Sequence, residues 1–297
     1  MSLYRVTFIA NAVSFYRFIA SRRRVFIAQL SFMYKIWTYI TEPVGNNEFN
    51  YNERIALWSK GKIFVPNLIQ WTVADLEEGS EIVFEETNNW ELVSCTWLKN
   101  FIDTSYKWVP TYIFDNHNHA LFFRYRHTAQ LKAPFLSPFA KGDAEGRGIL
   151  KKESLTKWGF KPFVVIHIDQ HADTKENKNS FKAVHSSPQE AFGFTNYACN
   201  VGNFLTSAKD AEIIDEIIQV RTDYTLNQLW TLNFELWTHY ILDIDMDFRE
   251  QKTDKEIQSD FEIIRKLIDN VCLITIATSP YFMEQKQAIK LIKELLQ

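Results

Sequence analysis

Three short apolar runs in the last two-fifths of the chain have the pattern of buried β-strands. They are Phe163–Ile168, Thr238 to Asp247, and Val271 to Thr278, the last of which is rich in β-branched residues and stops at Ser279-Pro280. Short apolar runs of this kind are typical of strands buried on both faces of a parallel sheet.

The segments around these runs carry helical signals. Ser187-Pro188 has the N-cap residue and the first-position proline of a helix start. Between Asp254 and Asn270 apolar residues recur at helical spacing, and Glu284 to Leu296 is amphipathic. Strands and helices that alternate at these lengths predict right-handed βαβ units and a mainly parallel sheet covered by helices.

The first half of the chain has a weaker pattern. Lys62 to Val73 and Ile82 to Leu98 alternate in the manner of strands, with Asn88-Asn89 as the expected turn. The proline- and glycine-containing stretch Lys132 to Glu153 predicts a loop, which is either a lid beside a site or a solvated connection.

Composition narrows the class of protein. The chain has 297 residues, 46% of them hydrophobic, which is enough for a sizeable core, and its formal net charge of −3 gives no reason to expect nucleic acid as a partner. No apolar run approaches the roughly 20 residues that span a bilayer, so we expect no integral membrane segment. Three widely spaced cysteines fit a reducing cytoplasm better than a disulfide framework.

Polar clusters follow three of the predicted strands, where a parallel sheet gathers its ligand-binding residues. The clusters are Asn116-His117-Asn118-His119, Asp169-Gln-His171-Ala-Asp173, and Asp243-Ile-Asp245-Met-Asp247. A single aspartate there is commonly a turn or cap residue. Three carboxylates on one strand end would repel one another, however, and a bound divalent cation removes that repulsion. The pattern therefore favours a metal site over structural caps.

The order of these motifs resembles the arginase–deacetylase superfamily. With Ile241-Leu-Asp-Ile-Asp-Met-Asp-Phe248 and Ala277-Thr-Ser-Pro-Tyr-Phe282, the chain looks most like the peptide arginases, which convert arginine residues of ribosomally made precursor peptides to ornithine. The resemblance runs from Trp108 to the C-terminus. It implies a three-layer α/β/α sandwich with a hydrolase core over 101–297. Residues 1–100 would be part of that core or appended to it, and could contact the peptide.

The resemblance also implies two Mn²⁺ ions per chain, with other divalent metals as alternatives. The implied ligands are six side chains: His119, Asp169, His171, Asp173, Asp245 and Asp247. Asp169 and Asp245 would bridge the two ions, and Asp243 would position the strand end from outside the ligand set. The choice between His117 and His119 as the ligand stays open. His119 is favoured because it precedes Ala120, as the ligand of relatives precedes a small residue, and His117 would then bond a ligand or the substrate.

The implied reaction is hydrolysis of a guanidinium group to urea and an amine. Two metal ions lower the pKa of a shared water, and the hydroxide attacks the guanidinium carbon. Asp173 would orient that hydroxide and take its proton. His185 matches the position of a proton-shuttling histidine in arginases, although it could simply be an exposed loop residue.

One position departs from the arginase pattern. A glutamate at the end of a late strand holds the guanidinium in arginases, and Thr278 or Ser279 stands there in this chain. Glu284 is the expected substitute. Two other functions stay open: hydrolysis of a small free guanidine compound, as in arginase or agmatinase, and metal-dependent peptide binding without turnover. A mononuclear, deacetylase-like site is disfavoured, because relatives of that type have histidine where Asp247 stands.

Overall fold

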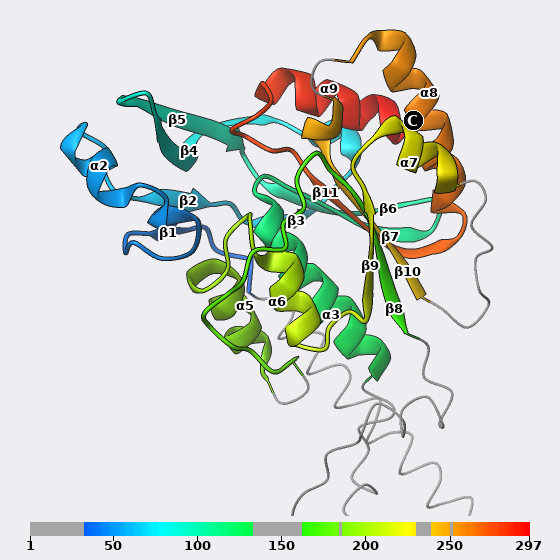
Figure 1. The fold of residues 1–297 in the computed structure, drawn as a ribbon, viewed down its shortest axis with the longest axis horizontal. Coiled ribbons are helices and arrows are strands. Elements are labelled where there is room, and N and C mark those ends of the chain that lie inside the picture. Colours follow the sequence, from blue (N-terminus) through cyan, green and yellow to red (C-terminus); the bar gives the residue numbers. More distant parts are fainter. Residues whose placement is uncertain (1–32, 133–161, 184–185, 230–238, 250–251) are drawn as a thin grey trace, which may run out of the picture.

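A seven-stranded mixed sheet forms the centre of the protein (Figure 1). The computed structural model describes residues 33–132, 162–183, 186–229, 239–249 and 252–297. The sheet has the order β3-β6-β7-β11-β10-β8-β9, and only the β6–β7 pair is antiparallel. Its strands are β3 (Leu68–Gln70), β6 (Phe101–Tyr106), β7 (Val109–Phe114), β8 (Phe163–Ile168), β9 (Glu216–Val220), β10 (His239–Asp245) and β11 (Val271–Ala277).

The prediction of an α/β fold with a mostly parallel sheet is confirmed. The first predicted strand coincides with β8, and the second ends at Asp245 because Met246–Arg249 turns into a 3-10 helix, η7. Ser187 caps helix α5 (Pro188–Tyr197) by accepting a hydrogen bond from the backbone amide of Glu190. Most of the predicted loop Lys132 to Glu153 lies outside the described residues.

Helices cover the sheet on both faces (Figure 1). Helices α3 (Ala120–Lys132), α5 and α6 (Phe204–Asp210) contribute to one apolar core. Helices α7 (Asp223–Gln228), α8 (Asp254–Ile268) and α9 (Gln285–Leu295) contribute to the other. Alternate residues of each central strand enter opposite cores, as the pleat requires. In β10, Ile241 joins the first core and Leu242 the second.

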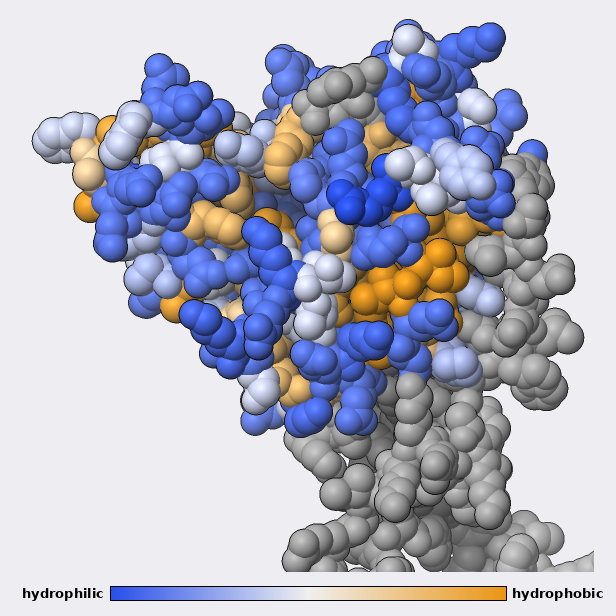
Figure 2. All heavy atoms as spheres, viewed as in Figure 1, coloured by the Kyte–Doolittle hydropathy of each residue, from blue (hydrophilic) through white to orange (hydrophobic). Residues whose placement is uncertain are grey.

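Hydrophilic side chains cover much of the molecular face shown in Figure 2, which also has one large hydrophobic area and several smaller ones. None of the helices in the described segments has the length and apolarity needed to cross a bilayer.

One row of polar residues crosses the sheet on the face that α3 covers. Neighbouring strands place its members directly opposite one another in the pairing register. In strand order the row is Asp103, Tyr112, Thr275, Asp243, His167 and Gln219. Helix α3 supplies the matching charges, since Arg124 pairs with Asp243 and Arg126 pairs with Asp103. Buried carboxylates need such partners.

Residues 33–100 supply β3, the edge strand of the main sheet, and further structure outside that sheet. They form β1 (Thr38–Ile40), β2 (Ile63–Val65), helix α2 (Tyr51–Ala56), strand β3 and the hairpin of β4 (Glu78–Asn88) and β5 (Glu91–Leu98). Short 3-10 helices η1 (Gly45–Glu48) and η2 (Val73–Asp75) connect them. The hairpin turns at Asn89 and Trp90, whose φ values of 49° and 67° fit a two-residue hairpin turn, one residue later than predicted.

The buried ion pair of Arg54 and Glu85 joins α2 to β4. Arg54 Nη1 lies 3.1 Å from Glu85 Oε2, and both side chains are buried. Arg54 Nε donates a hydrogen bond of 2.7 Å to the carbonyl oxygen of Phe49, and Nη2 donates to Asn47. Glu85 also accepts hydrogen bonds from Ser59 and Ser94. This network fixes the loop before α2 against the hairpin.

Removing one partner of this pair should destabilise the protein strongly. The substitution Arg54→Ala leaves the Glu85 charge buried without its cation, and we expect a loss of about 3–5 kcal/mol in the free energy of unfolding, measured by urea denaturation. Lys99→Ala is the control, because it breaks an ion pair whose two side chains are exposed and should cost less than about 1 kcal/mol. Equal losses for the two variants would contradict this account.

Candidate metal centre

The predicted polar clusters converge at the carboxyl ends of four adjacent parallel strands, β7, β11, β10 and β8. Asp169 directly follows β8, Asp245 ends β10, and His117 begins the 3-10 turn η3 (His117–His119) shortly after β7. Ser279 follows β11 and donates a hydrogen bond to Asp245. The parallel pairing of these strands brings together residues as far apart in sequence as His117 and Ser279.

The carboxylate of Asp243 lies beneath this cluster and is in contact with four side chains. Its Oδ1 accepts a hydrogen bond from Thr275 Oγ1 at 2.5 Å and lies 2.5 Å from Arg124 Nη2. Its Oδ2 accepts from His167 Nδ1 at 2.7 Å and from His117 Nε2 at 3.0 Å. Burial would raise the pKa of Asp243, but the charge of Arg124 and the histidine contacts hold this pKa well below its usual value. The carboxylate is therefore an acceptor that fixes both imidazoles.

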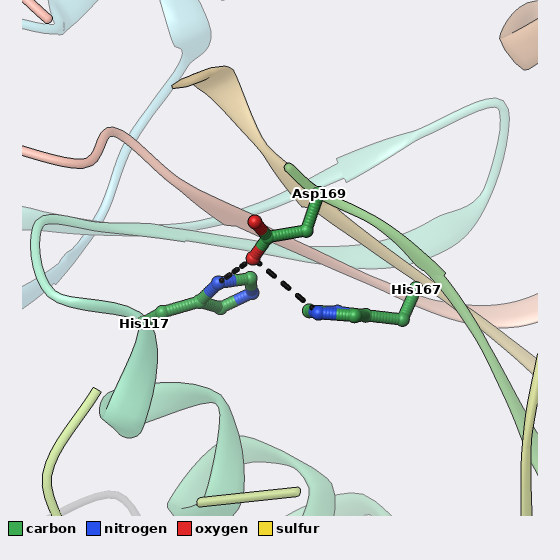
Figure 3. Close-up of side chains that lie close together, drawn as sticks. All are labelled: His117, His167 and Asp169. Carbon is green, nitrogen blue, oxygen red and sulfur yellow. Dashed lines mark ion pairs between the residues drawn. The ribbon is translucent and has the colours of Figure 1, made fainter. Parts of the chain in front are cut away.

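His117 turns its other ring nitrogen toward the aspartates. Burial would lower the pKa of His117, but Asp243, Asp169 and Asp245 raise it well above its usual value, so the ring is protonated when no metal is bound. Since Nε2 donates to Asp243, loss of the other proton to a metal ion would leave the lone pair at Nδ1. Nδ1 lies 3.1 Å from Asp169 Oδ2 and 3.0 Å from Asp245 Oδ2, yet makes no hydrogen bond (Figure 3). Asp173 Oδ2 lies 3.5 Å from the same atom. An imidazole nitrogen that faces several carboxylates is the arrangement of a metal ligand.

His119, the ligand expected from the sequence, lies elsewhere. Its Nδ1 is 2.9 Å from the hydroxyl of Tyr34, its Nε2 is 3.4 Å from Asp115, and its ring packs on Phe101. Side chains two positions apart on a 3-10 helix are separated by two-thirds of a turn, so His117 and His119 cannot face the same way. The expectation of His119 among the aspartates is therefore corrected, and His117 takes its place there.

A second group of donor atoms lies beside the first. His171 Nδ1 is 2.8 Å from Asp247 Oδ2 and 3.4 Å from Asp169 Oδ1. The backbone supports this group, because the amide of Asp247 donates to Asp245 and Gln170 Nε2 donates to the carbonyl oxygen of Asp247. Asp169 thus stands between His117 on one side and His171 on the other.

The donor atoms fit divalent metal ions. The structure contains two sets of ligand atoms, and within each set the atoms lie within 4.8 Å of one another. One set comes from His117, His167 and Asp169, and the other from Asp169, His171 and Asp247, so Asp169 belongs to both. Four buried atoms at the cluster have no hydrogen-bond partner: His117 Nδ1, His167 Nε2, Asp169 Oδ2 and Asp247 Oδ2. Buried polar atoms seldom stay unpaired, and carboxylate and imidazole donors suit divalent transition metals.

His167, in the apolar strand β8, lies against both Asp243 and Asp169. A lone histidine within an apolar strand is usually a hydrogen-bonded core residue, and the bond from its Nδ1 to Asp243 is of that kind. Its Nε2, however, lies 3.3 Å from Asp169 Oδ2 (Figure 3). The strand pattern alone could not reveal this contact, because it depends on where the backbone turns after Ile168. Arg124 was also missed, since a helix pattern does not say which arginine faces the sheet.

The cluster carries more negative charge than its own residues neutralise. Burial, together with the neighbouring Asp169, raises the pKa of Asp173 to about 9. Burial and Asp245 raise the pKa of Asp247 to about 7, and the carboxylates of Asp169 and Asp247 close to its ring raise the pKa of His171 to about 10. Without a cation, the site therefore retains protons near neutral pH.

A pocket of about 450 Å³ opens onto this centre. His117, His171, Asp173 and Asp245 all line it. Four aromatic residues form much of the remaining wall: Phe49, Phe84, Tyr281 and Phe282. Glu284, the expected acid for the substrate, is exposed and is not among the lining residues, whereas Glu86 of β4 is. His185, the expected proton shuttle, lies outside the described residues.

Comparisons with known proteins gave no match, whether to protein-family models, to curated proteins or to solved structures. The candidate function therefore depends on the geometry of this site and on the motifs that compose it.

Replacing the two neighbouring histidines should separate their roles. His117→Ala removes an imidazole that faces Asp169 and Asp245, so we expect Mn²⁺ affinity to fall by about 10-fold or more, measured by elemental analysis and calorimetry. His119→Ala should keep the metal and lower only the thermal midpoint, because that ring packs among Tyr34 and Phe101. Loss of metal from His119→Ala with retention in His117→Ala would reverse this assignment.

The metal-free protein should lose stability as pH rises from 7 to 9. The pKa values of Asp173 and His171 are about 9 and 10 in the folded state, above their usual values near 4 and 6.5. Raised pKa values give stability at low pH that disappears as pH climbs toward the folded-state value. We expect the thermal midpoint in chelator to drop by a few degrees over this range, and added Mn²⁺ to raise it more at pH 9 than at pH 7. A midpoint that rises with pH in chelator would contradict this account.

Proposed function

We propose that this chain is a dinuclear metal hydrolase that converts arginine residues of a peptide to ornithine and urea, that is, a peptide arginase. The observation that carries the proposal is Asp169, whose two carboxylate oxygens face two separate groups of ligand atoms. A carboxylate shared between two metal ions is the arrangement that two-metal hydrolysis requires.

The wider architecture supports the same assignment. Apolar cores lie on both faces of the sheet, each with its own set of helices, which fits a three-layer α/β/α sandwich of the arginase type. The polar clusters follow the carboxyl ends of parallel strands, where ligands bind in such folds. We propose that sandwich for residues 101–297, with residues 33–100 packed against it.

Two Mn²⁺ ions suit the donor set, which is rich in carboxylates and also contains imidazole. The proposed ligands are His117, Asp169, His171, Asp173, Asp245 and Asp247. Bound divalent ions would acidify water at this site and so supply a nucleophile near neutral pH.

The chain's own residues position the reaction. Asp243 holds His117 through Nε2, so that Nδ1 stays turned toward Asp169 and Asp245. Asp173 lines the pocket and lies at the cluster, where it can accept a proton from the attacking water. The leaving amine needs a proton as well, and His185 is the residue proposed for that step on the basis of its sequence position.

A peptide is the proposed partner in preference to a small guanidine compound. The pocket wall contains Phe49 and Phe84 from the region before residue 101, which lies outside the arginase resemblance. Rigid aromatic side chains make peptide-contacting surfaces at low entropic cost. Cytoplasm is the proposed compartment, in keeping with three cysteines that are all free thiols.

A second candidate is a metal-containing peptide-binding protein without turnover. The observation in its favour is at the end of β11, where Thr278 and Ser279 stand in place of the glutamate that arginases use. Ser279 donates its hydroxyl to Asp245 and so does not replace that acid. Metal content and urea release together separate the two candidates.

The Mn²⁺-loaded protein should release urea from an arginine-containing peptide and leave ornithine, detected by urea assay and peptide mass. Two metal ions per chain are expected by elemental analysis. Asp245→Asn should lose metal and lower the rate by at least about 100-fold, because Asp245 is one of the carboxylates at His117. Asp210→Asn, at an exposed position at the end of α6, is the matched control and should keep both the metal content and the rate of the unmutated protein.

The outcomes have distinct meanings. Two ions without urea from a leader-bearing precursor would favour the binding protein. One ion per chain would indicate mononuclear, deacetylase-like chemistry, and no bound metal would refute the proposal.

A further inference from the structure

Glu86, on the β4–β5 hairpin, lines the pocket together with residues of the strand ends. In β4, Phe84 and Glu86 are two residues apart and both line the pocket, so they share one face of the strand. Glu85 between them faces the other way and pairs with the buried Arg54. The regular pairing of β4 with β5 from Phe84 to Asn88 fixes this alternation.

The Glu86 carboxylate is partly buried and forms no hydrogen bond or ion pair with another residue in the described part of the chain. Its neighbours differ in this respect, since Glu85 pairs with Arg54 and Glu81 accepts a hydrogen bond from Tyr39. Burial raises the pKa of Glu86, while the charges of Lys175 and Arg54 oppose that shift. A carboxylate left in this condition gains from a cationic partner.

Aromatic rings connect Glu86's side of the pocket with the metal centre. The ring of Phe84 lies 5.5 Å from that of Phe49 and 5.7 Å from that of Tyr281. Tyr281 contacts Phe282 at 5.0 Å, and Phe282 lies 4.5 Å from the ring of His171. A planar guanidinium can stack on such rings while its N–H groups bond a carboxylate.

We propose that Glu86 binds the cationic group of the substrate. The substrate side chain would lie on the rings of Phe84, Tyr281 and Phe282. This inference rests on the proposed hydrolysis of a guanidinium group. It assigns substrate recognition to a hairpin far from the arginase-like motifs. It also replaces Glu284, which is exposed and absent from the pocket lining.

Two tripeptides test the inference by binding alone. Acetyl-Gly-ornithine-Gly-amide carries a cationic side chain and no guanidinium to hydrolyse, whereas acetyl-Gly-citrulline-Gly-amide is neutral and has the shape of the arginine peptide. Calorimetry on the Mn²⁺-loaded protein should show tighter binding of the cationic peptide. Glu86→Gln should weaken that binding roughly 10- to 100-fold and change citrulline binding less than about twofold.

Two control variants locate the effect. Glu91→Gln removes the same charge from an exposed position on the same hairpin and should leave both affinities unchanged. Glu284→Gln tests the acid that the sequence suggested and should also leave them unchanged. The inference is overturned if the unmutated protein does not prefer the cationic peptide. Equal effects of Glu86→Gln on the two peptides, or loss of the preference in Glu284→Gln instead, would overturn it as well.

Turnover of the arginine tripeptide separates this inference from the proposed function. If urea is released, Glu86→Gln should raise KM by about 10-fold or more, and an unchanged KM would refute the role of Glu86 while hydrolysis stands. If no urea is released from the tripeptide or from a leader-bearing precursor, but the cation preference depends on Glu86, the hydrolase proposal fails and the recognition site stands.

Discussion

The site depends on the contacts of one buried carboxylate, that of Asp243. It joins β10 to β8 through His167, to β11 through Thr275, to α3 through Arg124 and to the η3 turn through His117. A buried charge is costly unless each of its lone pairs has a partner, so these contacts must form together. By meeting that requirement, the fold fixes which nitrogen of His117 faces the cluster.

Above Asp243, whose two carboxylate oxygens both have partners, lies a group of donor atoms without hydrogen-bond partners. Asp169, Asp245 and Asp247 meet at neighbouring strand ends, and ring nitrogens of His117 and His167 face them without hydrogen bonds. The contrast between Asp243 and this group is the reason for proposing metal ions. Asp243 is paired with the permanent cation Arg124, whereas no lysine or arginine of the described residues forms an ion pair with Asp169, Asp245 or Asp247.

The pocket joins two parts of the chain that differ in character. The strand ends of the sheet and the segments that follow them provide the proposed ligands, and the β4–β5 hairpin provides Phe84 and Glu86. The Arg54–Glu85 pair holds that hairpin to α2 and to the loop that carries Phe49. Chemistry and substrate recognition would then have separate structural supports, so that the recognition wall could change without disturbing the metal ligands.

The sequence by itself determined the α/β class, the central strands and the aspartate clusters at their ends, because apolar runs, caps and strand-end carboxylates are local patterns. Phe163–Ile168 and the Ser187 cap are examples. Only the tertiary structure decided between His117 and His119, brought His167 to Asp169 and turned Glu86 rather than Glu284 toward the pocket. Those choices depend on how a 3-10 turn, a strand end and a distant hairpin are oriented in space. Such orientations are set by contacts between segments remote in sequence, which no local pattern records.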